Sequence, residues 1–277
     1  MSNPAFNRMP AFDPKNQQTL SADQLREIYN QPAATVAAKT AHQGAQPGFA
    51  LGGSATPMTY ENTITKTVML FLVLLTTAAV GWMFPILAIP GAIAGLVLGL
   101  INAFKREPSV PLIVLYAAAE GLFVGGISQI FEARWAGIVF QAVLGTVIVF
   151  GVTLLLFRSG KVRTSPRANK IFLVATVGYL AFSVVNLVLM WTGVASDPWG
   201  LRGVQLFGGI PLGVIIGALA ILLAAYSLVQ DFDVIKGGVE NRIDQKYGWS
   251  AAFGLMVTLV WLYVEILRLL AILRGND

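Results

Sequence analysis

The chain has 277 residues, of which 56% are hydrophobic and only 12% are charged. A soluble domain carries about 25% charged residues, so this composition is typical of a membrane protein. There is no cysteine and one histidine, His42, which excludes disulfides and argues against cysteine- or histidine-ligated metal sites. The net charge of +5 arises from basic residues in short loops between apolar runs, a pattern of membrane topology and not of nucleic-acid binding.

The N-terminal segment differs from the rest of the chain. It is polar and rich in Ala, Gln, Asn, Pro and Thr. Such a composition cannot bury enough apolar surface to fold alone. We therefore predict a disordered cytoplasmic tail over residues 1–62 and a membrane domain over residues 63–277.

Seven apolar runs follow the tail, and each is long enough to cross a hydrocarbon core of about 30 Å. The first two are separated only by a turn near Pro85 and are predicted to form a helical hairpin. The fold class predicted is all-α: a polytopic membrane protein with seven transmembrane helices. The runs cover residues 64–84, 86–104, 110–131, 135–157, 171–191, 206–229 and 249–273.

Lys and Arg are distributed unevenly among the predicted loops. Ten lie in the loops after the second, fourth and sixth helices, whereas the opposite loops contain only Arg134 and Arg202. Basic residues stay on the cytoplasmic side of a membrane. The N-terminus is therefore expected in the cytoplasm, and seven spans then place the C-terminus outside.

Three acidic side chains, Glu120, Asp231 and Glu265, lie inside or at the edge of the apolar runs. A carboxylate at mid-bilayer costs about 2.5–3.5 kcal/mol on insertion scales, and such groups usually line ion or proton pathways. The alternative is a protonated acid that forms a hydrogen bond between helices. For Asp231 a second alternative is that it and Asp233 simply end the sixth helix in water.

The surroundings of two of these acids differ. Glu120 lies about ten residues into the third helix, roughly 15 Å deep, and that helix contains no basic residue to neutralise it. Glu265 has Arg268 three residues later, on the same helix face. A structural ion pair is therefore an alternative to a pathway role for Glu265, but not for Glu120.

The sequence contains no spacing typical of an enzyme. It has neither a zinc-protease HExxH motif nor a phosphate-binding loop, and serines within the spans lack a lysine at helical spacing. The only aspartates near a span are Asp231 and Asp233, at one helix end. We therefore expect no enzymatic activity and no cofactor.

Three segments carry a family resemblance: residues 120–125 (EGLFVG), 231–235 (DFDVI) and 262–273 (LYVEILRLLAIL). In a chain of seven spans they resemble the Bax inhibitor/YccA-like family, also called the transmembrane Bax-inhibitor-motif proteins, over about residues 60–275. The resemblance implies a seventh helix that runs through the centre of the other six. It also implies a pH-sensitive calcium leak, gated by aspartates on helices 6 and 7.

The resemblance assigns roles to individual residues only in part. Asp231 matches the sixth-helix aspartate, but the seventh-helix aspartate falls at about Thr258, which is not acidic. The chain therefore resembles a divergent bacterial branch, expected in the inner (plasma) membrane. In relatives the basic end of helix 2, here Lys105 and Arg106, can pair with the sixth-helix acid.

These residues suggest how a gate would work. Ionised Asp231 would form a latch with Lys105, Arg106 or Lys236, and protonation or a competing cation would weaken it. Glu120 and Glu265 would offer oxygen ligands further along the path. Isolated carboxylates bind calcium only weakly, so we expect no dedicated metal site.

Two functions of different class follow. The first is the pH-sensitive calcium or cation leak, gated by buried carboxylates. The second is a non-enzymatic membrane protein that binds and modulates a membrane protease or another membrane complex, as some bacterial relatives of the family do. The buried acids favour the first and the polar tail favours the second. The lipid bilayer is a partner in both, and the sequence leaves the oligomeric state open.

Overall fold

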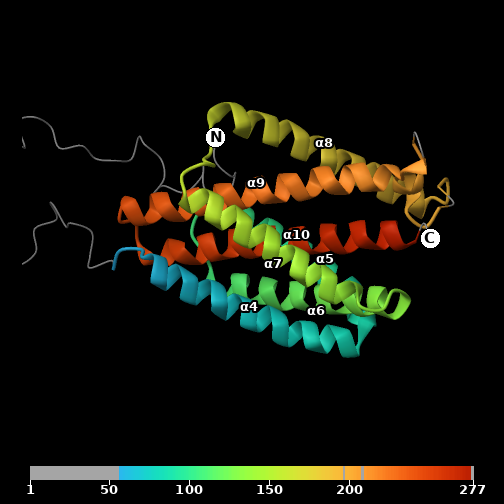
Figure 1. The fold of residues 1–277 in the computed structure, drawn as a ribbon. Helices are drawn as coiled ribbons and strands as arrows, with labels where there is room; N and C mark the ends of the chain where they lie inside the picture. The colour runs from blue at the N-terminus through green and yellow to red at the C-terminus, as the bar shows by residue number, and fades with distance from the viewer. Residues whose placement is uncertain (1–55, 196, 207–208, 276–277) are drawn as a thin grey trace, which may run out of the picture.

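The computed structural model describes residues 56–195, 197–206 and 209–275. These residues form seven helices that are long and apolar enough to cross a membrane, which confirms the predicted all-α polytopic architecture (Figure 1). Residues 1–55 of the predicted tail lie outside the described residues. The spans are α4 (Tyr60–Met83), α5 (Ala88–Phe104), α6 (Val110–Arg134), α7 (Ile138–Arg158), α8 (Pro166–Trp191), α9 (Leu212–Glu240) and α10 (Gly248–Arg274).

Short 3-10 turns join several of these helices. The turn η3 (Pro85–Leu87) connects α4 to α5, as expected for the predicted hairpin. The turn η4 (Gly200–Gly203) lies between α8 and α9, and η6 (Gln245–Tyr247) directly precedes α10. Of the three, η4 bears on the candidate site, because it carries Arg202.

The sixth span differs from its predicted range of residues 206–229. Helix α9 begins directly after Pro211 and continues to Glu240. Proline has no backbone N–H and fixes its own φ, so it suits a position just before the first helical turn. At the other end the chain stays helical beyond the apolar run because Asp231 and Phe232 are buried in the bundle. Asp231 is thus well inside a helix and not at its end.

Helices α4 and α6 approach each other closely through glycine. A Cβ atom added to Gly125 would overlap the backbone of Ala78, and one added to Gly81 would overlap the backbone of Leu122. Small residues at such positions let helix backbones touch in lipid, where packing drives association. The GxxxG spacing of Gly121 and Gly125 therefore marks a helix contact within this chain.

Helix α10 is the most enclosed span. Within its most apolar stretch 56% of the residues are buried, compared with 11% in α8. It packs against α4, α6, α7 and α9, whereas α8 lies along the outside (Figure 1). Polar side chains of α10 therefore point into the protein interior, where they meet those of α9 and α8.

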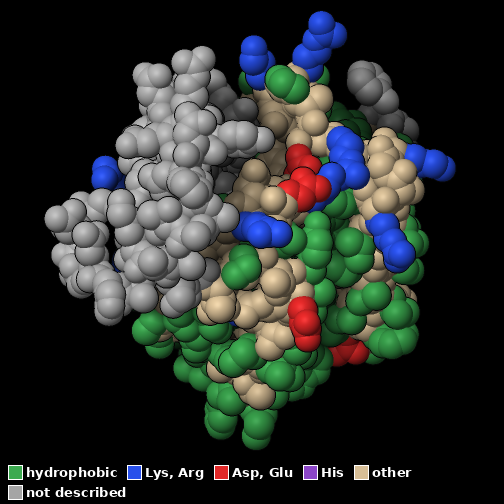
Figure 2. Space-filling view, turned by 90° about the vertical axis from the view of Figure 1, so that its left-hand side faces the viewer, with side chains coloured by type: hydrophobic (Ala, Val, Ile, Leu, Met, Phe, Trp, Pro, Cys, Tyr) green, Lys and Arg blue, Asp and Glu red, His purple; other side chains and the backbone are tan. Residues whose placement is uncertain are grey.

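Lys and Arg side chains gather at the end of the bundle where α4 and α10 begin (Figure 2). This end carries the loops between α5 and α6, between α7 and α8, and between α9 and α10. It is the end that the distribution of basic residues assigns to the cytoplasm. We call it the inner end below, and the opposite end, with η4, the outer end.

Candidate functional site

Asp231 is buried, with 4% of its surface exposed. Its Oδ2 accepts a hydrogen bond of 2.6 Å from the Thr258 hydroxyl on α10. Because that proton is given to Asp231, Ser227, whose Oγ lies 3.2 Å from Thr258 Oγ1, must be the donor in their contact. The three side chains form one hydrogen-bonded chain between α9 and α10. The alternative in which Asp231 merely ends a helix in water is therefore wrong.

The expected latch is not formed in this structure. Among the described residues no ion pair includes Asp231, so neither Lys105 nor Arg106 nor Lys236 reaches it. Lys236 instead lies 3.5 Å from Glu240, four residues later on α9. Five residues separate Asp231 from Lys236, which places them about 140° apart around the helix. Asp231 is held by a hydroxyl and not by a cation.

A cavity of about 430 Å³ lies next to this hydrogen-bonded chain. Residues of α5, α6, α8, α9 and α10 line it, among them Thr258 and Ser227. Glu120 lines it from α6, and Lys105 lines it from the inner end of α5. Two of the predicted acids are thus associated with one cavity, Glu120 at its wall and Asp231 directly behind Thr258.

Glu120 has the surroundings that the sequence suggested. Its carboxylate lies against α5 at Gly95, where an added Cβ would be 2.9 Å from Glu120 Oε1. Tyr116, one helical turn earlier, is its polar neighbour. No ion pair in the described part of the chain includes Glu120, so neither its own helix nor the neighbouring ones supply a cation to it.

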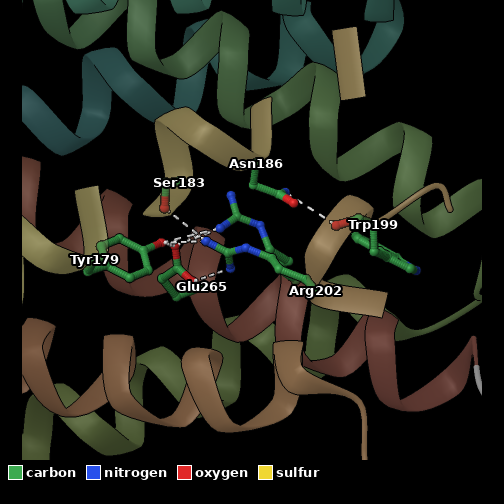
Figure 3. Close-up of polar contacts among 7 residues, drawn as sticks. Tyr179, Ser183, Asn186, Trp199, Arg202 and Glu265 are labelled. Carbon is green, nitrogen blue, oxygen red and sulfur yellow. Dashed lines mark hydrogen bonds and ion pairs between the residues drawn. The ribbon is translucent and has the colours of Figure 1, made fainter. Parts of the chain in front are cut away.

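Glu265 belongs to a separate cluster nearer the outer end (Figure 3). It is buried, with 2% of its surface exposed. Arg268 Nη1 lies 2.8 Å from its Oε1, and Arg202 Nη1 lies 3.7 Å from its Oε2. The Tyr179 hydroxyl on α8 also donates to Oε1. One carboxylate is therefore shared by two guanidinium groups, and the cluster has a net charge of +1.

Arg202 is the residue that sequence reasoning missed. It was counted only as a loop residue, yet it is 4% exposed and its Nη2 donates to Tyr179 Oη at 3.2 Å and to Ser183 Oγ at 3.0 Å. Its guanidinium also lies over the rings of Tyr179 and Phe182, 5.5 and 5.7 Å from the centroids. The available signal is that Arg202 is the only Lys or Arg between Trp191 and Leu212.

Asn186 holds the η4 turn that carries Arg202 (Figure 3). Its Oδ1 accepts from the backbone N–H of Leu201 at 2.6 Å, and its Nδ2 donates to the Trp199 carbonyl at 3.3 Å. Gly200 has a φ of +60°, a conformation that favours glycine, and it lies directly against Asn186. Helix α8 thus fixes both the turn and the arginine.

A model of the family described as Bax inhibitor 1 like matches residues 3–275, and the chain belongs to this family. The match begins near the start of the chain, so it includes the polar N-terminal segment that the resemblance left out. No curated protein matches the chain.

Proposed function

We propose that this Bax inhibitor 1 like protein provides a pH-sensitive leak pathway for calcium or other cations across the bacterial inner membrane. The proposal includes the predicted orientation, with the N-terminus in the cytoplasm and the C-terminus outside. One observation carries it: Glu120 lines a cavity among the membrane spans, Asp231 lies directly behind Thr258 at the same cavity, and no ion pair among the described residues includes either carboxylate. Carboxylates in such positions are characteristic of ion and proton pathways.

The hydrogen-bonded chain at Asp231 would serve as the gate. When Asp231 is ionised, it holds the Thr258 hydroxyl and so ties α9 to α10. Protonation removes the charge that makes this hydrogen bond strong, because bonds to ionised acceptors are roughly twice as strong as neutral ones. A hard cation that enters the cavity competes for the same oxygen atoms. Both events would loosen the contact between the two helices.

The outer cluster would close the other end of the pathway. Its two guanidinium groups and single carboxylate present net positive charge to a cation that leaves the cavity. Such a charge opposes passage, so conduction requires Arg202 or Arg268 to move away. The pathway then has one control at Asp231 and a second barrier at Glu265.

The test is calcium-dye flux into liposomes that contain the purified full-length protein, measured as a function of pH. Asp231→Asn should raise the flux or flatten its pH dependence. Asp233→Asn is the matched control, because Asp233 lies two residues away on α9 and accepts from Thr164 instead. If the flux of Asp231→Asn depends on pH as that of the wild type does, Asp231 is not the gate.

A modulator of a membrane protease or of another membrane complex is the second candidate function. The observation that favours it is the family match from residue 3, since a pore alone does not need a polar segment of this length. Deletion of residues 1–55 tests it. Loss of co-purifying membrane proteins with unchanged flux would support the modulator, whereas a change in flux alone would speak against it.

A further inference from the structure

We propose that the cavity at Glu120 is a binding site for a small organic ammonium ion. The Glu120 carboxylate would pair with the ammonium group, and the aromatic walls of the cavity would hold the apolar body. This inference goes beyond the cation pathway and does not depend on conduction. It rests on the charge of the cavity, its size and the chemistry of its walls.

Among the described residues Glu120 is the one acidic residue that lines the cavity. No cationic side chain among the described residues pairs with Glu120, and its polar neighbour is the Tyr116 hydroxyl. Lys105 also lines the cavity, but it lies ten residues from Gly95, which is about 15 Å along α5. A carboxylate at membrane depth is costly when unpaired, so a bound cation would compensate it.

The size of the cavity fits an organic molecule. Its volume of about 430 Å³ falls within the range of about 300–1,000 Å³ typical of small-molecule sites. Calcium prefers six to eight oxygen ligands, usually with several carboxylates. The described residues contain no group of three acidic or histidine side chains that could hold a metal ion. Glu120 is the one acidic residue of the described chain that lines the cavity, since Asp231 lies behind Thr258, and one carboxylate in a large cavity suits a monovalent organic cation better.

The side chains that line the cavity would contact the apolar part of the ligand. Tyr116, Phe172, Phe253 and Trp261 line the cavity from three different helices. Aromatic faces attract cations, and their rings also bury apolar groups. Thr176 lines the cavity as well, and its hydroxyl is buried without a hydrogen-bond partner. An N–H group of a bound ammonium ion would satisfy it.

The experiment compares benzylammonium with benzyl alcohol, a neutral probe of similar shape, by calorimetric titration of the purified full-length protein in detergent at pH 7. Benzylammonium should bind at least about tenfold more tightly, because a charge-assisted hydrogen bond adds to the burial of the ring. Glu120→Gln should remove that difference. Glu107→Gln, a change at an exposed carboxylate outside the cavity, is the matched control and should preserve it.

A wall variant separates the aromatic contribution from the charge. Trp261→Leu should weaken the binding of benzylammonium while the preference over benzyl alcohol remains. Equal binding of the two probes to the wild-type protein would overturn the inference without any variant. A calcium flux that responds to Asp231→Asn in a protein that binds no benzylammonium would also overturn it, yet would leave the proposed pathway standing.

Discussion

Replacement of Glu265 by Gln should destabilise the protein by about 3–5 kcal/mol, the usual effect of removing one partner from a buried ion pair. The structure gives the reason. Among the described residues Glu265 is the only carboxylate that forms an ion pair with Arg202 or Arg268, and Arg202 is almost fully buried. Without it, two guanidinium groups of like charge remain close together in the membrane interior.

The two arginines should not contribute equally to this loss. Unit charges about 4 Å apart attract by about 4 kcal/mol at an effective dielectric constant of 20. Arg202 lies at 3.7 Å with a side chain 5% exposed, whereas Arg268 lies at 2.8 Å with a side chain 29% exposed. Arg268 donates only one long hydrogen bond to Tyr179, at 3.4 Å, so it is able to extend toward the interface when Glu265 is removed. Arg202 cannot extend in this way, because its hydrogen bonds to Tyr179 and Ser183 hold it in the interior.

Replacing either arginine in the Glu265→Gln protein should therefore restore stability, but to a different extent for each arginine. Arg202→Met should recover more of the lost free energy of unfolding than Arg268→Met. The measurement is unfolding by SDS in mixed micelles, followed by circular dichroism. Glu240→Gln is the control, because its exposed pair with Lys236 is worth no more than about 0.5 kcal/mol. Equal rescue by the two arginine substitutions would refute the reasoning, as would a Glu265→Gln protein as stable as the wild type.

Three other outcomes are expected. Thr258→Asp places a second carboxylate against Asp231. Since two carboxylates in contact resist double ionisation, one of them keeps its proton to higher pH, so the calcium-dye flux should change at a higher pH than in the wild type, and an unaltered curve would count against the gate. A reporter enzyme fused after Asp277 should be found outside the cytoplasm. Reporter activity in the cytoplasm would contradict the proposed orientation. Gly125→Leu should lower stability by about 1–3 kcal/mol because its side chain would overlap α4; Gly151→Leu, where a Cβ meets open space, should change it little, and similar losses would exclude this packing.

The spans could be predicted from the sequence because lipid imposes one rule: side chains that face it are apolar. Apolar runs of sufficient length mark helices whatever their neighbours are. The rule fails where a polar residue is covered by protein. The apolar run predicts a sixth span that ends at Val229, with Asp231 at the cytoplasmic end of the helix. Packing against α10 keeps this stretch helical and buries Asp231, which no property of the residues in isolation reveals.

The candidate site could be predicted only where local spacing sufficed. Glu265 and Arg268 lie three residues apart on one helix, so their pairing follows from helical geometry. Arg202 reaches Glu265 from a loop far away in the sequence, and Thr258 reaches Asp231 from another helix. Such contacts depend on tertiary structure. Helical geometry alone argues against the latch with Lys236, because five residues along a helix lead to a different face.

The contact between Asp231 and Thr258 suggests how a gate can operate with one aspartate. The resemblance places a second aspartate at about Thr258, where this chain has a hydroxyl that donates to Asp231. A pair of acids responds to pH through mutual repulsion. An acid with a hydroxyl responds through the strength of a single hydrogen bond. The second negative charge of the cavity stands instead on Glu120, on another helix, and no hydrogen bond joins it to Asp231. Groups without shared partners act nearly independently, so in the proposed pathway control by protons at Asp231 and attraction of cations at Glu120 would be separable.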